Sequence, residues 1–316
     1  MQPKSSSTIL ITDSLFISKK NEKLLQQAGF QIERIDNPKL SESELCEAIK
    51  GKVGYILGGV EIVTKKVIDS ADELKAIAFT GAGYTEFIPA YKEATKKGIL
   101  ISNAPGGNAD AVAEFTIMLI LMMTRNILSL GRIGKSSFKT SKSLKDSTVG
   151  VVGLGRVGFL VVSYLKALGV NDILYYSKVR KFHLEGGLGL EFVSKEDLLK
   201  RSQIITIHTS KDAGEEFISR SDINLISDGA IIINTAFPEV IDLNSLKEQL
   251  VSKRLFAAFD RPPNIDFSMI PPEQFFYSNS QTGFNTFEAI ETVSDMATRS
   301  LINLLTKHGD AFCVNK

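Results

Sequence analysis

The chain is poor in cysteine and carries almost no net charge. It has 316 residues, and its two cysteines, Cys46 and Cys313, lie far apart in the sequence. This placement is neither a disulfide framework nor a metal-binding spacing, so we expect a cytoplasmic protein without a metal site. The formal net charge of +1 creates no field that would attract nucleic acid or an acidic membrane.

Long apolar runs are also missing. The most apolar stretch, FTIMLILMM at 115–123, falls well short of the about 20 residues that a membrane-spanning helix needs. The opening residues, MQPKSSSTILITDS, contain too short an apolar run for a signal peptide. We therefore expect neither a membrane segment nor a signal peptide, and we interpret 115–123 as part of a buried helix.

Short apolar runs that alternate with helical periods are present instead. Most of them are β-branched or aromatic throughout, as parallel strands covered on both faces are. This alternation predicts a doubly wound α/β fold, and the length fits two domains. The expected strands are 8–12, 53–57, 76–80, 99–103, 148–153, 172–177, 204–209, 230–236, 255–259 and 275–279.

Helix signals lie between these strands. Ser41 and Glu44 form a capping box, and Gly169 is suited to end a helix. A long helix is expected from the run AVAEFTIMLILMMTRNI, and one more ends the chain. The polar, basic segment 131–147 reads as a surface connection that leads into a new first strand.

The stretch TVGVVGLGRVG predicts a dinucleotide site. Gly153, Gly155 and Gly158 form G-x-G-x-x-G directly after a strand and directly before a helix. The first glycine permits a tight turn, the second a close approach of the backbone to a diphosphate, and the third close packing of helix on strand. The helix N-terminus offers N–H groups and a partial positive charge to the phosphates.

The end of the next strand favours NADP over NAD. An acidic residue there would bond the ribose 2′-hydroxyl of NAD, but the sequence reads Ser177, Lys178, Val179, Arg180 and Lys181. A hydroxyl and two or three cations can bind a 2′-phosphate, and no carboxylate stands at the strand end to repel it. The alternative is a merely solvated basic loop.

Four segments resemble the D-isomer-specific 2-hydroxyacid dehydrogenases. They are GAGYTEFIPAYKEATKKGILISNAPGGNADAVAEFT at 81–116, the glycine motif TVGVVGLGRVG, SQIITIHTS at 202–210, and GAIIINTAFPEVIDLNSLKEQLVSKRLFAAFD at 229–260. The resemblance implies two doubly wound domains. Residues 1–103 and 286–316 would form a flavodoxin-like substrate domain, and residues 104–285 an NAD(P)-binding Rossmann domain. It also implies a homodimer and a small-molecule carbonyl substrate.

Together, the motif and the resemblance identify candidate cofactor-binding positions. The helix N-terminus and the loops after the following strands supply them. They are Gly153, Leu154, Gly155, Arg156, Val157, Gly158, Ser177, Lys178, Arg180, Thr209, Thr235, Ala236, Asp260 and Gly283.

The catalytic positions of the family are all altered. The resemblance implies an arginine that pairs with the substrate carboxylate, a histidine that donates a proton and a glutamate that keeps the histidine charged. The matching positions hold Phe237, Gln281 and either Ile265 or, with a shift of one residue, Asp266. His208 lies at a strand end near the expected nicotinamide, and we interpret it as structural.

The substrate side keeps glycine turns at strand ends. Gly58, Gly59, Gly81 and Gly83 would offer backbone N–H groups to an anion, although ordinary strand-to-helix turns explain them equally well. Tyr84 follows as a possible proton donor, and Arg261 is a second candidate partner for an anion if its loop folds inward.

Two functions fit these residues. One is an NAD(P)-dependent oxidoreductase that acts on a 2-oxo acid, a related carbonyl or an imine through an altered site. The other is an inactive homologue that binds NAD(P) as a sensor or partner subunit. Hydride transfer needs chiefly placement of the nicotinamide against the carbon, whereas the lost catalytic residues favour the inactive homologue.

Overall fold

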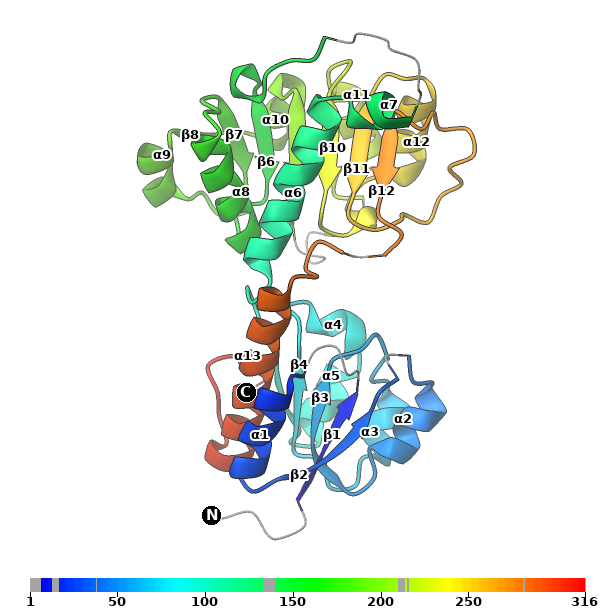
Figure 1. Cartoon of the computed structure of the whole chain (residues 1–316), viewed down its shortest axis with the longest axis vertical. Helices are drawn as coiled ribbons and strands as arrows, with labels where there is room; N and C mark the ends of the chain where they lie inside the picture. Colours follow the sequence, from blue (N-terminus) through cyan, green and yellow to red (C-terminus); the bar gives the residue numbers. More distant parts are fainter. Residues whose placement is uncertain are drawn as a thin grey trace. The chain divides into compact units, whose positions relative to one another are not determined.

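The fold consists of two compact α/β units. The computed structural model describes residues 7–12, 17–37, 39–132, 140–209, 214, 216–280 and 282–315. The first unit comprises Met1–Asn108 with Asn285–Lys316, and the second Ala109–Phe284. Each contains one parallel sheet with helices on both faces (Figure 1). The predicted fold class is confirmed.

The first unit is built on a five-stranded sheet with the order β2-β1-β3-β4-β5. Apolar side chains of α2, α3 and α5 pack on one face, and those of α1 and the C-terminal helix α13 on the other (Figure 1). The strands are β1 (Thr8–Thr12), β2 (Gln31–Ile35), β3 (Lys52–Leu57), β4 (Ala76–Phe79) and β5 (Leu100–Ser102). The helices are α1 (Lys19–Gln27), α2 (Glu42–Ala48), α3 (Lys65–Ser70), α4 (Tyr84–Phe87), α5 (Tyr91–Lys96) and α13 (Phe287–Lys307).

Helix ends in this unit follow the expected chemistry. Ser41 and Glu44 form the predicted capping box at the start of α2. The side chain of Thr286 accepts a hydrogen bond from the Ala289 N–H and begins α13. The amide of Asn21 in α1 donates to Ser294 Oγ at 2.8 Å, which fastens α13 to the N-terminal residues.

The second unit is built on a seven-stranded sheet with the order β12-β11-β10-β9-β6-β7-β8. Helices α6 and α8 cover one face, and α10, α11 and α12 cover the other (Figure 1). The strands are β6 (Val149–Val152), β7 (Ile173–Tyr176), β8 (Leu190–Phe192), β9 (Ile204–Ile207), β10 (Ile231–Asn234), β11 (Phe256–Phe259) and β12 (Phe275–Tyr277). The helices are α6 (Ala109–Thr124), α7 (Ile127–Arg132), α8 (Arg156–Ala167), α9 (Phe182–Leu188), α10 (Lys195–Arg201), α11 (Arg220–Leu225) and α12 (Leu243–Val251).

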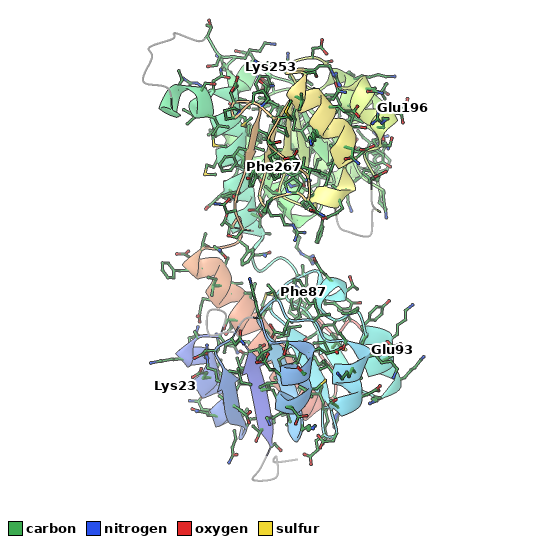
Figure 2. All side chains as sticks on the ribbon, turned by 90° about the vertical axis from the view of Figure 1, so that its right-hand side faces the viewer. Lys23, Phe87, Glu93, Glu196, Lys253 and Phe267 are labelled. Carbon is green, nitrogen blue, oxygen red and sulfur yellow. The ribbon has the colours of Figure 1, made fainter. Side chains whose placement is uncertain are left out.

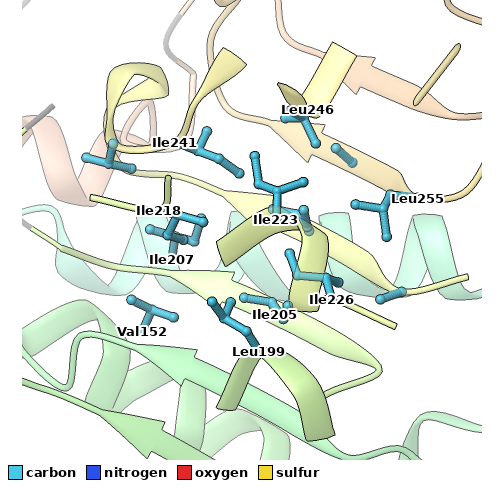
Figure 3. Close-up of a cluster of buried hydrophobic side chains, with 14 of the residues drawn as sticks. Val152, Leu199, Ile205, Ile207, Ile218, Ile223, Ile226, Ile241, Leu246 and Leu255 are labelled. Atoms are coloured by element: carbon cyan, nitrogen blue, oxygen red, sulfur yellow. The ribbon is translucent and has the colours of Figure 1, made fainter. Parts of the chain in front are cut away.

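The core of this unit shows why its strands are apolar throughout. Side chains alternate between the two faces, and both faces are covered. In Figure 3, Val152 and Ile205 from the sheet meet Leu199 of α10, and Leu246 of α12 lies in the same cluster.

Strands β2 and β8 were not expected from the sequence. β2 lies at one edge of its sheet, and its residues are partly or fully exposed. β8 has three residues and is likewise an edge strand. Edge strands of this kind lack the continuous apolar run by which the other strands are recognised.

The order of the second sheet defines a switch point. The chain passes from β6 outward through β7 and β8, returns to β9 on the other side of β6, and then proceeds outward to β12. In such sheets ligands bind at the carboxyl ends of the strands, where the direction reverses. Here that place lies between the ends of β6 and β9.

Candidate functional site

The carboxyl edge of the seven-stranded sheet holds most of the predicted cofactor residues. All its strand pairs are parallel, so the loops after β6, β7, β9, β10 and β11 emerge on the same side. Each of these loops contributes residues named from the sequence. We call this group of loops the carboxyl edge.

The three glycines after β6 meet different surroundings. Gly153 has φ of +96°, and a Cβ there would lie 2.6 Å from the His208 carbonyl oxygen. A Cβ on Gly158 would lie 2.1 Å from the carbonyl oxygen of Gly153. A Cβ on Gly155 would meet no heavy atom within 4 Å. The outer glycines thus allow close packing of the protein on itself, whereas the middle one leaves space for a ligand.

Helix α8 begins at this space without a side-chain cap. Its N-cap residue is Gly155, no acidic residue lies in its first turn, and the helix runs for 12 residues. The N–H groups of Arg156, Val157 and Gly158 have no carbonyl acceptor within the helix. An anion such as a diphosphate satisfies these donors and gains from the helix dipole.

Two oxygen atoms further along the carboxyl edge, like the nearby Arg261 Nε, are buried without a hydrogen-bond partner among the described residues. They are Thr209 Oγ1 after β9 and Asp260 Oδ2 after β11. The other oxygen of Asp260 accepts N–H bonds from Thr282 at 3.0 Å and Gly283 at 2.8 Å. Burial raises the pKa of Asp260, and the two N–H groups act in the opposite direction. Buried atoms left unsatisfied are costly, so a ligand that bonds them gains affinity.

The loop after β10 is held by its own side chains. Asn234 Oδ1 accepts from the Ala236 N–H at 2.9 Å, and Asn234 Nδ2 donates to the Phe237 carbonyl at 3.0 Å. Thr235 Oγ1 lies 3.0 Å from Thr116 Oγ1 of α6. The loop backbone is thereby held beside the end of β11, and the Arg261 guanidinium carbon lies 4.7 Å from the Phe237 ring centroid.

In the loop after β7, Arg180 was expected to be available for a 2′-phosphate, but it is paired with a carboxylate. Ser177 Oγ donates to the Val179 carbonyl at 2.7 Å. Arg180 forms a two-pronged ion pair with Glu185 of α9, with both N–O distances at 2.8 Å. Arg180 and the Tyr175 hydroxyl lower the pKa of Glu185 to about 2. A carboxylate therefore lies beside this basic loop, although none follows the strand directly, and it offsets the charge of Arg180.

The structure does not bring Asp266 to the Phe237 loop. The Asp266 side chain is 67% exposed and lies 3.5 Å from Lys247 Nζ of α12. Its neighbours Ile265 and Phe267 turn inward, and the Phe267 ring, labelled in Figure 2, stacks on Tyr277 with centroids 4.4 Å apart. The alternation explains why Asp266 points outward. Gln281 lies outside the described residues.

His208 is a neutral, structural histidine in this fold. Its ring Nε2 lies 2.8 Å from Thr206 Oγ1, and its backbone N–H donates to the Val152 carbonyl at 2.8 Å. Burial lowers its pKa to about 3. At neutral pH the ring therefore carries no extra proton to give to a substrate.

The substrate-side glycines follow β3 and β4 in the first unit. Gly58 and Gly59 are buried, whereas Gly81 and Gly83 are more open. Gly83 precedes α4, and Tyr84 begins this helix with its ring edge-on to Tyr91, at a centroid distance of 5.8 Å. The roles of these residues in substrate binding stay predictions.

A buried polar cluster beside these glycines was missed from the sequence. Glu61 is 3% exposed, and its Oε1 accepts hydrogen bonds from Thr12 and from the Tyr55 hydroxyl. Burial and the neighbouring carboxyl raise the pKa of Tyr55 well above its ordinary value. An acidic residue in the run GGVEIV gave no sign that its side chain would turn inward.

A doubly wound unit with a glycine turn at its switch point is the arrangement of dinucleotide-dependent dehydrogenases. Residues 117–266 match the sequence profile of the D-isomer specific 2-hydroxyacid dehydrogenase NAD-binding domain. Over 303 residues the chain is 31% identical to a glyoxylate reductase of Thermofilum pendens, covering 87% of this chain and 85% of that protein. The chain therefore belongs to the D-isomer specific 2-hydroxyacid dehydrogenase family, a class of NAD-dependent oxidoreductases, and the predicted resemblance is confirmed.

Other proteins are similar in sequence or share the fold. A D-3-phosphoglycerate dehydrogenase of Methanocaldococcus jannaschii is 32% identical over 309 residues, which are 94% of this chain and 57% of that protein. An NAD⁺-bound 3-phosphoglycerate dehydrogenase of Entamoeba histolytica has the same fold, with a TM-score of 0.83, 23% identity and coverage of 98% and 99%. So does an acyclic imino acid reductase in complex with NADPH and D-Arg, with a TM-score of 0.84, 20% identity and coverage of 97% and 99%. Within the described residues, no helix is long and apolar enough to cross a membrane.

Proposed function

We propose that this protein is a reductase that uses NADPH in preference to NADH and transfers hydride to a 2-oxo acid or a related carbonyl compound. One observation carries the proposal. The carboxyl edge combines the open space at Gly155 and the uncapped start of α8 with unpartnered polar atoms on Thr209 and Asp260. These features suit the diphosphate and the nicotinamide end of a dinucleotide.

Different loops of the carboxyl edge would hold the different parts of such a cofactor. The N–H groups of Arg156 and Val157 would hold the diphosphate. Ser177 and Lys178 would face the 2′-phosphate, and the Arg180 guanidinium would contribute less because it is paired with Glu185. Thr209 and Asp260 would hold the nicotinamide end. A bound nicotinamide supplies the hydride.

The protein must obtain the proton for the substrate oxygen without the family's usual acid. The matching position holds Gln281, whose amide does not release a proton at neutral pH. His208 is neutral. Water would then supply the proton, and a lost general acid costs about 10²–10⁴-fold in rate. We therefore propose slow turnover with carbonyl substrates.

Reduction of an iminium compound is the second candidate. A protonated imine accepts hydride at carbon and needs no further proton to complete the step, so the missing acid costs it nothing. One structural neighbour is named as an imino acid reductase bound to NADPH. This candidate rests on the replacement of the catalytic histidine position by glutamine.

The test is a substrate panel followed by absorbance at 340 nm. Glyoxylate, hydroxypyruvate, pyruvate and phenylpyruvate are mixed with NADPH or NADH, with and without methylamine to form imines. Turnover with an acid alone supports the carbonyl reductase, and turnover only with amine present supports the imine reductase. NADPH binding with no turnover on the whole panel supports an inactive sensor or partner subunit instead.

A cytoplasmic homodimer completes the proposal. Helices α6 and α7 expose Met118, Leu121, Ile127 and Leu130, each at least 37% accessible. Apolar side chains grouped in this way are typical of a surface that another protein covers. A second copy of this chain would cover it through the cofactor-binding unit.

A further inference from the structure

We infer that Arg261 binds the substrate carboxylate in place of the arginine that the family resemblance implies at position 237, and that the Phe237 ring holds Arg261 ready for it. This inference rests on the proposed function, since it names the group that recognises the 2-oxo acid. It is a specificity role for a residue outside the family's catalytic set.

The two residues meet because their strands are neighbours. Asn234 at the end of β10 pairs with Phe259 at the end of β11. The Asp260 N–H donates to the Asn234 carbonyl at 3.0 Å, so the two loops start side by side. Phe237 and Arg261 lie a few residues beyond this bond, with 4.7 Å between guanidinium carbon and ring centroid. A cation in the loop after β11 is thereby brought to the loop where the family resemblance implies an arginine.

The hydrogen-bonding capacity of Arg261 is unused within the described part of the chain. Its Nε is buried there without a hydrogen-bond partner. A guanidinium in this state presents two parallel N–H donors that match a carboxylate. Its charge still reaches the adjacent carboxyl, because Arg261 acts to lower the pKa of Asp260.

The aromatic ring gives the arrangement its rigidity. A guanidinium over an aromatic face is attracted by the ring quadrupole. Asn234 hydrogen-bonds the backbone of the Phe237 loop, and the Phe237 ring packs against the core of the unit. A cation held in one orientation loses less entropy when it binds an anion. Phe237 thus serves as a positioning residue, and Arg261 as the group that touches the substrate.

Substitutions at position 261 test the inference. Arg261→Gln should raise KM for the 2-oxo acid about tenfold or more, because a charged hydrogen-bonded pair is lost. The uncharged amide of the same acid should change less than about threefold. Arg261→Lys keeps the charge without the planar fork, so it should fall between the two. Arg220→Gln is the matched control, since this arginine is exposed in the same unit and pairs with Glu248.

A binding measurement tests Arg261 without turnover. Oxamate, an unreactive analogue of a 2-oxo acid, is titrated calorimetrically into the NADPH-loaded protein. Arg261→Gln should weaken oxamate at least about tenfold and change NADPH affinity by a smaller factor. Phe237→Leu should weaken oxamate by a smaller factor, and the exchange Phe237→Arg with Arg261→Phe should restore it.

The outcomes separate the inference from the proposed function. Wild-type protein that binds NADPH and oxamate but turns over nothing overturns the proposed reductase, and the oxamate series still decides Arg261. Unchanged oxamate affinity in Arg261→Gln, or an equal loss for acid and amide, overturns the role of Arg261.

Discussion

Alanine at Gly155 should mainly weaken NADPH binding, whereas alanine at Gly158 should mainly lower the stability of the second unit. Gly155→Ala adds a methyl group where no heavy atom lies within 4 Å. The stability should fall by no more than about 1 kcal/mol, which is the ordinary difference between residues at an N-cap. The methyl group would nevertheless occupy the space over the start of α8. NADPH affinity should therefore drop about tenfold or more.

Gly158→Ala should instead lower the stability of the second unit. Its Cβ would lie 2.1 Å from the Gly153 carbonyl oxygen, about 1 Å inside the closest carbon–oxygen contact. Either α8 or the turn must shift, and overpacking of this kind costs about 1–3 kcal/mol. The apparent Tm of the second unit should fall by several degrees, about 2–4 °C for each kcal/mol.

Two measurements on each variant decide the matter. Thermal unfolding followed by circular dichroism reports stability, and NADPH fluorescence titration at fixed salt reports binding. The reasoning would be refuted if Gly155→Ala bound NADPH like the parent protein, because the open space would then not be the diphosphate site. Gly158→Ala with unchanged Tm would refute the packing role of the third glycine.

Three further predictions follow from other parts of the second unit. The pKa of His208 is lowered from 6.5 to about 3, so the unfolded state binds the proton first as the pH falls. Unfolding free energy should then decrease below pH 6.5 by up to about 1.4 kcal/mol per pH unit until about pH 3, and His208→Gln should lack this contribution in urea titrations. Ser177→Asp should shift the preference from NADPH toward NADH by repelling the 2′-phosphate, and equal Kd ratios before and after would speak against the cofactor assignment. Met118→Glu with Leu121→Glu should convert a dimer into monomers in sedimentation velocity, whereas a monomeric parent protein would exclude the proposed interface.

The strands could be predicted from the sequence wherever they are buried on both faces of the sheet. β6, β9 and β10 are apolar throughout, and each was located within two residues at either end. β2 was missed because QIERI alternates polar and apolar residues at an exposed edge. β8 was missed because three residues carry no periodicity.

The residues of the candidate site could be predicted from the sequence only where the backbone geometry requires one residue type. Gly153 and Gly158 are required by contacts to backbone atoms, so their spacing survives as a motif. Asp266 depended on an alignment with a one-residue ambiguity, and only the packing of Ile265 and Phe267 shows that its side chain points outward. Glu185 lies on α9, and its contact with Arg180 depends on where that helix folds back.

The replacement of arginine by phenylalanine at position 237 need not mean the loss of carboxylate recognition. A parallel sheet brings the carboxyl ends of neighbouring strands to one edge, so a side chain in the loop after β11 can reach the loop after β10. The ring of Phe237 and the guanidinium of Arg261 are in contact. Phe237 alone could not bind a carboxylate, because its ring carries no charge. Arg261 without the ring would lose the contact that positions its guanidinium. An inactive homologue is under no constraint to keep Arg261 buried at Nε without a partner in the described residues, because an unsatisfied buried donor only lowers stability. The pairing is therefore better explained by a ligand that completes it.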